Sequence, residues 1–238
     1  MFDHGGMAAT PTSLRVVRST TPQAELENLR NRLHRMQGEP VRQPVPTPDV
    51  VRGLIEVRTG GAYRVDDQSL AIAVLSAASV EGSWVGVVGV DDLGLEAAAE
   101  AGVDLARAVM VPDPGASWLE AVTALVDVLP IVLLRPPSHV DQRLASKVSA
   151  RLRKRSATLF VQGDWPGAEA RLWLERTRWS GMGDGFGRLR ERSAQVGCRR
   201  GTAPAQFADW PSDLRWSSAQ AKPGRIETRH ETGTAVAG

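Results

Sequence analysis

Short apolar runs alternate with longer helix-type segments through the middle of the chain. The apolar runs contain few polar residues, which is typical of parallel strands buried on both faces. The pattern predicts strands at residues 62–65, 84–90, 108–111, 131–134 and 158–162, and helices at 69–79, 92–101, 117–129 and 138–155. This order predicts right-handed βαβ units, and therefore an α/β fold with a mostly parallel sheet flanked by helices.

The pattern changes after Gly163. Residues 168–178 and 188–199 alternate apolar with polar positions, and the glycine-rich segment 180–187 lies between them. Alternation of this kind predicts antiparallel strands joined by a turn. We expect them at one edge of the sheet.

Both ends of the chain differ from the middle. Residues 1–20 and most of 201–238 are rich in small and turn-forming residues, and we expect them to be disordered tails. Residues 21–38 predict an amphipathic helix, 39–49 a proline-spaced linker, and 50–200 the α/β core. The helix carries a one-faced apolar stripe of Leu26, Leu29, Leu33 and Met36. This stripe either packs on the core or binds a partner or a second copy of the chain.

Composition restricts where the protein acts. The chain has 238 residues, 42% of them hydrophobic and 24% charged, which is ordinary for a globular protein. A single cysteine, Cys198, excludes an internal disulfide and fits a reducing compartment. No apolar run approaches membrane-spanning length. We therefore expect a cytoplasmic protein.

Charge is unevenly distributed. Residues 1–150 hold 13 Lys and Arg against 18 Asp and Glu, whereas residues 151–238 hold 16 against 9. A basic half suggests contact with DNA or an acidic partner, although solvated arginines are the commoner explanation. The candidate DNA contacts are Arg151, Arg153, Lys154, Arg155, Arg188 and Arg190. Trp165, Trp173 and Trp179 either stack on single-stranded bases or pack within the sheet.

The stretch 60–79 has the layout of a phosphate-binding loop: a strand, a turn and a buried helix. Its turn, Asp66 to Ser69, contains no glycine and no lysine, and no lysine precedes Lys147 anywhere in the chain. Two carboxylates stand where a triphosphate needs amide groups and a cation. We expect Asp66 or Asp67 to cap the following helix.

A protein that hydrolyses nucleotides with a phosphate-binding loop also needs an acid that binds magnesium, and this second requirement is missing too. The strand at 131–134 ends in Arg135 where a magnesium-binding acid is needed. Asp91 and Asp92 end another strand and are the best remaining acid/base or metal pair, with capping of the next helix as the alternative. The sequence thus predicts no catalytic residue, no metal site and no bound cofactor.

The order of these motifs resembles the RecA-type ATPase core, and more closely its diverged bacterial relatives in the ImuA and SulA-like group. The residues that carry the resemblance are Gly60-Gly61-Ala62-Tyr63, 84–92, 101–105, 111–113 and Leu133-Leu134-Arg135-Pro136-Pro137. Residues 163–167 and 178–181 are similar to the actinobacterial version, called ImuA-prime.

This resemblance implies a RecA-like fold with a degenerate phosphate loop, acting without ATPase activity as an accessory protein of SOS-induced, error-prone translesion DNA synthesis. It implies an ImuB-like inactive Y-family polymerase as partner, and indirectly an error-prone C-family DNA polymerase. Self-association through the helix at 21–38 would also fit, as would DNA contact, but a membrane would not. The alternatives are an atypical RecA-family ATPase, a DNA-binding repair factor and a SulA-like inhibitor of cell division.

Overall fold

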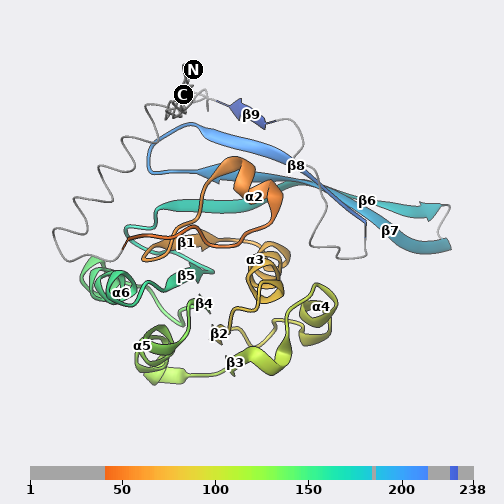
Figure 1. Ribbon diagram of the computed structural model, residues 1–238. Helices are drawn as coiled ribbons and strands as arrows, with labels where there is room; N and C mark the ends of the chain where they lie inside the picture. Colours follow the sequence, from red (N-terminus) through yellow and green to blue (C-terminus); the bar gives the residue numbers. More distant parts are fainter. Residues whose placement is uncertain (1–40, 184–185, 214–225, 230–238) are drawn as a thin grey trace, which may run out of the picture. The chain divides into compact units, whose positions relative to one another are not determined.

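The computed structural model describes residues 41–183, 186–213 and 226–229, with the backbone alone for 180–183, 186–191, 211–213 and 226–229. Within them, nine strands form one sheet with helices on its faces (Figure 1). The strands are β1 (Ala62–Val65), β2 (Val85–Val88), β3 (Ala108–Val111), β4 (Ile131–Leu134), β5 (Thr158–Val161), β6 (Ala170–Gly183), β7 (Phe186–Arg199), β8 (Ala205–Asp213) and β9 (Ile226–Arg229). The helices are α2 (Asp49–Leu54), α3 (Gln68–Val80), α4 (Leu95–Glu100), α5 (Trp118–Val128) and α6 (Gln142–Arg155), with short 3-10 helices η1 (Leu105–Arg107) and η2 (Gly115–Ser117).

The strand order is β3-β2-β4-β5-β1-β6-β7-β8-β9. Every neighbouring pair from β3 to β6 is parallel, and every pair from β6 to β9 is antiparallel. The predicted α/β fold with a mostly parallel, helix-flanked sheet is therefore confirmed. The antiparallel pair predicted after Gly163 is confirmed as well, and it forms β6 and β7.

Helices cover both faces of the parallel part of the sheet. Figure 1 shows α5 and α6 on one face and α3 and α4 on the other. Alternate residues of one strand enter different cores: Val132 and Leu134 pack with α5 and α6, and Leu133 packs with α3. All residues of β2, β4 and β5 are buried, which explains their nearly continuous apolar sequences.

The body of the fold begins earlier than expected. The linker was predicted to run to residue 49, but Val45 donates its backbone N–H to the Val57 carbonyl at 2.8 Å, and Thr59 donates to the Gln43 carbonyl at 2.8 Å. These bonds explain why the compact unit starts at Arg42 and not at residue 50. A run of prolines fits this role because an edge segment needs few backbone donors.

The prediction of a mostly disordered region at 201–238 is wrong for β8 and β9. In β8, Ala208 and Trp210 pack into the core while the strand pairs with β7 from Glu191 to Cys198. The segment is rich in polar and turn-forming residues, so its own pattern is weak. The free edge of β7 provides the pairing that the local sequence does not specify.

The helix predicted at 92–101 is also shorter than expected. It begins at Leu95, because Gly94 has a φ of 71° that interrupts the helical backbone at its N-cap. The tail at 1–20 and the helix at 21–38 lie outside the described residues. No helix in the described ranges is long and apolar enough to cross a membrane.

Candidate functional site

The carboxyl ends of the parallel strands are where an open α/β sheet usually binds ligands. Here the ends of β1, β2, β4 and β5 surround a shallow depression of about 560 Å³. It is lined by Arg64, Asp66, Gln68, Asp92, Arg135, Gln162, Gly163 and Asp164. This is the place where the resemblance to a RecA-type core would put a nucleotide.

The turn between β1 and α3 is closed by its own side chain. The Asp67 carboxylate accepts hydrogen bonds from the backbone N–H groups of Ser69, at 2.8 Å, and Leu70, at 3.2 Å. These first-turn amides are the groups that would bind a phosphate at a helix N-terminus. The expectation that Asp66 or Asp67 caps the helix is confirmed for Asp67.

Arg135 spans the depression from the end of β4. Its guanidinium donates to Asp92 Oδ1 at 2.7 Å, to Gln162 Oε1 at 3.1 Å and to Gln68 Oε1 at 3.2 Å. Gln162 Nε2 also donates to Gln68 Oε1 at 2.8 Å, and Gln68 Nε2 donates to the Asp92 carbonyl at 2.9 Å. These four side chains, from three loops and the first turn of α3, form one closed polar network, here called the strand-end network.

Close backbone packing fixes where Arg135 stands. The Arg135 backbone N–H donates to the Val88 carbonyl at 2.9 Å, which joins the ends of β4 and β2. Gly89 has a φ of 72°, and a Cβ atom there would lie 2.3 Å from the Arg135 carbonyl oxygen. Only glycine fits this approach. The Arg135 backbone is therefore held against the end of β2, and its side chain starts from a fixed position at the strand ends.

The two strand-end aspartates face this arginine. Asp92 is bonded to Arg135, and Asp91 Oδ1 lies 3.7 Å from the same guanidinium. Neither caps α4, whose N-cap is Gly94, so the capping alternative is wrong. Among the described residues, no group of three His, Cys, Asp or Glu side chains is placed to hold a metal ion.

The other charges of the depression are paired too. Arg64 lies 2.7 Å from Asp164 and 3.4 Å from Asp66, and Asp66 also accepts from Arg171 of β6 at 2.5 Å. Acidic and basic groups therefore compensate one another across the strand ends. The charged side chains of the depression therefore form ion pairs with one another.

A buried arginine that the sequence did not single out connects the turn to the antiparallel strands. Arg192 of β7 is 7% exposed and donates to Ser69 Oγ at 2.7 Å. Its guanidinium lies 5.6 Å from the Trp179 ring centroid and 5.1 Å from that of Trp210. Burial lowers the pKa of Arg192, and the charge of Asp67 opposes that shift. Arg192 is one of several arginines in an alternating strand, so no sequence signal distinguishes it.

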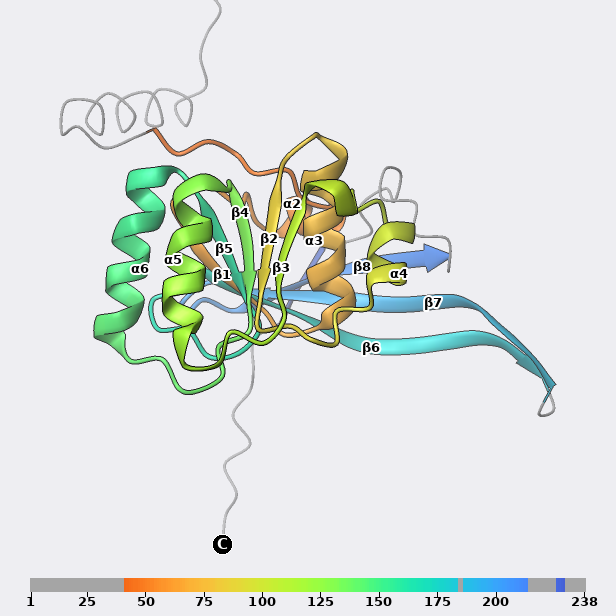
Figure 2. The same cartoon turned by 90° about the horizontal axis from the view of Figure 1, so that it is seen from below.

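The candidate DNA contacts are not brought together. Arg151 and Arg155 of α6 both bond Asp127 of α5, with Arg151 Nε at 2.6 Å and Arg155 Nε at 3.1 Å from Oδ1. Arg153 and Lys154 are exposed on the same helix. Arg188 and Arg190 belong to β7, and their side chains lie outside the described residues. Figures 1 and 2 both show α6 and the far end of β7 on opposite sides of the fold.

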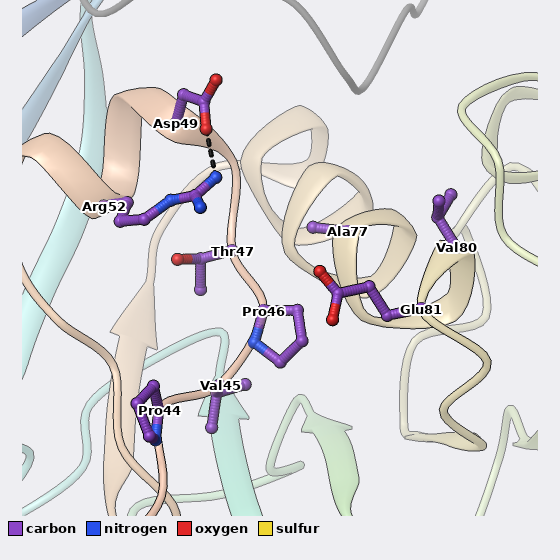
Figure 3. A pocket seen from close by; sticks show the side chains of 9 residues that line it. All are labelled: Pro44, Val45, Pro46, Thr47, Asp49, Arg52, Ala77, Val80 and Glu81. Carbon is purple, nitrogen blue, oxygen red and sulfur yellow. Dashed lines mark hydrogen bonds and ion pairs between the residues drawn. The ribbon is translucent and has the colours of Figure 1, made fainter. Parts of the chain in front are cut away.

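A second hollow of about 420 Å³ lies between the linker and the end of α3 (Figure 3). Pro44, Pro46 and Val45 form one wall, and Val80 and Glu81 the other. Its lining mixes aliphatic and polar side chains, and the Asp49 and Arg52 side chains on its rim are paired with each other. It holds no group of side chains suited to acid/base or nucleophilic chemistry.

Comparison with known proteins gives a family. The MT3502 N-terminal domain family matches residues 50–167. The chain is 32% identical over 158 residues to the protein named Uncharacterized protein Rv3395c of Mycobacterium tuberculosis (strain ATCC 25618 / H37Rv), which covers 62% of this chain and 74% of that protein. The crystal structure of the RadB recombinase is similar with a TM-score of 0.46 and 12% identity, over 66% of this chain and 89% of that chain. A likeness of that extent says nothing about function.

Proposed function

This chain belongs to the MT3502 N-terminal domain family, and we propose that it is a non-catalytic accessory protein of error-prone translesion DNA synthesis. In this proposal the α/β core has kept the layout of a nucleotide-binding domain and given up the nucleotide. The protein then acts as a scaffold that joins other proteins.

The observation that carries the non-catalytic part is the strand-end network. Arg135 occupies the position where a magnesium-binding acid would be needed, and its guanidinium is bonded to Asp92 at 2.7 Å. A metal ion bridging phosphates at this place would be repelled by that guanidinium. The charge of Asp92 is therefore neutralised by Arg135, which stands where a second, magnesium-binding acid would be needed.

The closed turn supports the same proposal from the phosphate side. The Asp67 carboxylate already occupies the amides of Ser69 and Leu70. A phosphate at the start of α3 would have to displace this carboxylate and then sit beside its negative charge. The lost cap and the repulsion would both make phosphate binding less favourable.

The biological setting rests on the resemblance to ImuA-prime. That resemblance implies an ImuB-like inactive Y-family polymerase as direct partner and an error-prone C-family polymerase as an indirect one. The uneven charge of the chain and its apolar stripe at Leu26, Leu29, Leu33 and Met36 are compatible with a protein-binding role.

Nucleotide titration tests the non-catalytic part. The full chain is titrated with ATP and Mg²⁺ by calorimetry, and hydrolysis is followed in parallel. We expect no turnover and no saturable binding up to about 1 mM ATP, which means any binding free energy is weaker than about −4 kcal/mol. Micromolar binding that is lost in Asp91→Ala, and kept in the matched control Glu100→Ala on α4, would show an atypical ATPase and refute this part.

Association and mutagenesis test the accessory part. We expect the purified chain to co-elute with an ImuB-like partner. In cells, the double variant Asp91→Ala, Asp92→Ala should support damage-induced mutagenesis as the wild type does. Failure to associate with the partner removes the scaffold role even if no nucleotide binds. Loss of mutagenesis in a double variant that still folds and still binds the partner would indicate catalysis at the strand ends.

A further inference from the structure

The antiparallel strands β6 and β7 form a ribbon that extends past the parallel core (Figure 2). Each strand has 14 residues, but β1 pairs only with Ala170 to Leu172 of β6. On the other side, β8 pairs with β7 only as far as Glu191. From Trp173 onward, no described strand pairs with the free edge of β6.

Trp179 stands on this free part of the ribbon. It is 50% exposed, whereas Trp165 is 4% exposed. Trp173 is packed over Gly197, where a Cβ atom would lie 2.3 Å from the ring, and meets Phe207 edge-on. Of the three tryptophans considered for base stacking, Trp179 is therefore the one that presents its ring to solvent.

The exposed ring is held in place from below. Arg192 lies 5.6 Å from the centre of the Trp179 ring and is itself fixed by its bond to Ser69 and its contact with Trp210. A cation–π contact of this kind is favourable and orients the ring. A pre-oriented aromatic side chain loses little conformational freedom when a ligand stacks on it.

The charge around the ring favours an anionic ligand. Residues 170–199 include seven arginines against three acidic residues. Arg171 is bonded to Asp66, but no described residue pairs with the exposed Arg176 or Arg178. Arg176 has a φ of 54° at a bulge in β6, which increases the local twist of the ribbon.

From these observations we propose that Arg176, Arg178 and Trp179 form a binding surface for single-stranded nucleic acid. Side chains at 178 and 179 point to opposite faces of the strand, so the ligand passes along the free edge of β6 and contacts both. A base stacks on Trp179, and phosphates pair with the arginines. A duplex would bind more weakly because its bases are already stacked. This surface is separate from the strand-end network, and the inference stands whether or not the accessory role does.

Fluorescence anisotropy of the full chain with a labelled oligothymidylate of about 20 nucleotides tests the proposal. Trp179→Ala should weaken binding roughly 5- to 100-fold, and Trp179→Phe should weaken it less because a ring remains. Arg178→Gln should reduce the slope of log affinity against log salt by about 0.7. The matched control is Trp84→Ala, since Trp84 is 47% exposed but precedes β2 at the other end of the parallel strands.

Several outcomes would overturn the proposal. The wild type could show no saturable binding, or a folded Trp179→Ala variant could bind as tightly as the wild type. An equal loss in Trp84→Ala would show that the binding is non-specific. If Trp179→Ala instead lost the protein partner and kept its affinity for the oligonucleotide, the ribbon would be a protein-docking surface.

Discussion

Removing the cap of α3 is the most direct perturbation of the closed turn. In Asp67→Ala the backbone amides of Ser69 and Leu70 lose the carboxylate that accepts them at 2.8 and 3.2 Å. Loss of an N-cap aspartate costs about 0.5–2 kcal/mol of the free energy of unfolding. Because Leu70 is fully buried and two amides are affected, we expect a loss of about 1–2 kcal/mol.

Asp67→Asn separates the cap from the charge. Asparagine is about as good an N-cap as aspartate, so this variant keeps the acceptor and loses the negative charge that favours the buried Arg192 guanidinium. The difference between wild type and Asp67→Asn reports the charge. The difference between Asp67→Asn and Asp67→Ala reports the cap.

Urea and thermal unfolding measure these differences. For a domain of about 200 residues, a loss of 1–2 kcal/mol lowers Tm by roughly 2–8 °C, and the urea midpoint should fall without a change of slope. Equal stability of Asp67→Ala and Asp67→Asn would refute the capping role. A rise of the wild-type Tm on addition of Mg²⁺ and ATP would show that the turn still accepts phosphate.

Three further outcomes follow from individual contacts. Gly197→Ala would push a Cβ atom against the Trp173 ring and should lower the free energy of unfolding in urea by about 1–3 kcal/mol. Burial raises the pKa of Tyr63 to about 12, so the stability that this phenol contributes is present below pH 10 and is lost between pH 10 and 12. In unfolding measured as a function of pH, Tyr63→Phe should flatten that loss. Hydrogen bonds from Arg151 and Arg155 lower the pKa of Asp127 to about 2, so the contribution of its carboxylate to stability is lost as pH falls from about 4 to 2. Thermal unfolding of Asp127→Asn should lack this decrease of stability at acid pH.

The parallel core was predictable because its signal is local. A strand such as Ile131–Leu134, buried on both faces, must be apolar at every position, and that pattern is readable without knowing its neighbours. The closed turn was predictable for a similar reason: Asp67 and the amides that it caps lie within four residues. Local capping follows from residue type and spacing.

The strand-end network and β8 were not predictable in the same way. Gln68, Arg135 and Gln162 lie far apart in the chain, and only the strand order places the ends of β1, β4 and β5 side by side. The β8 strand needs the free edge of β7 before its weak pattern becomes a strand. Both features depend on contacts between distant residues, which composition and periodicity do not encode.

The closed turn and the ribbon are parts of one arrangement, and Arg192 is the residue that joins them. Its guanidinium bonds Ser69 in the first turn of α3, contacts Trp179 on the ribbon, and is favoured by the charge of Asp67. A phosphate at this turn would have to displace the Asp67 carboxylate from the Ser69 and Leu70 amides. A variant that removed this carboxylate to open the turn, such as Asp67→Ala, would also lose the negative charge that favours the buried arginine beside the ribbon. As long as no phosphate replaced that charge, the variant would therefore weaken the support of the Trp179 ring.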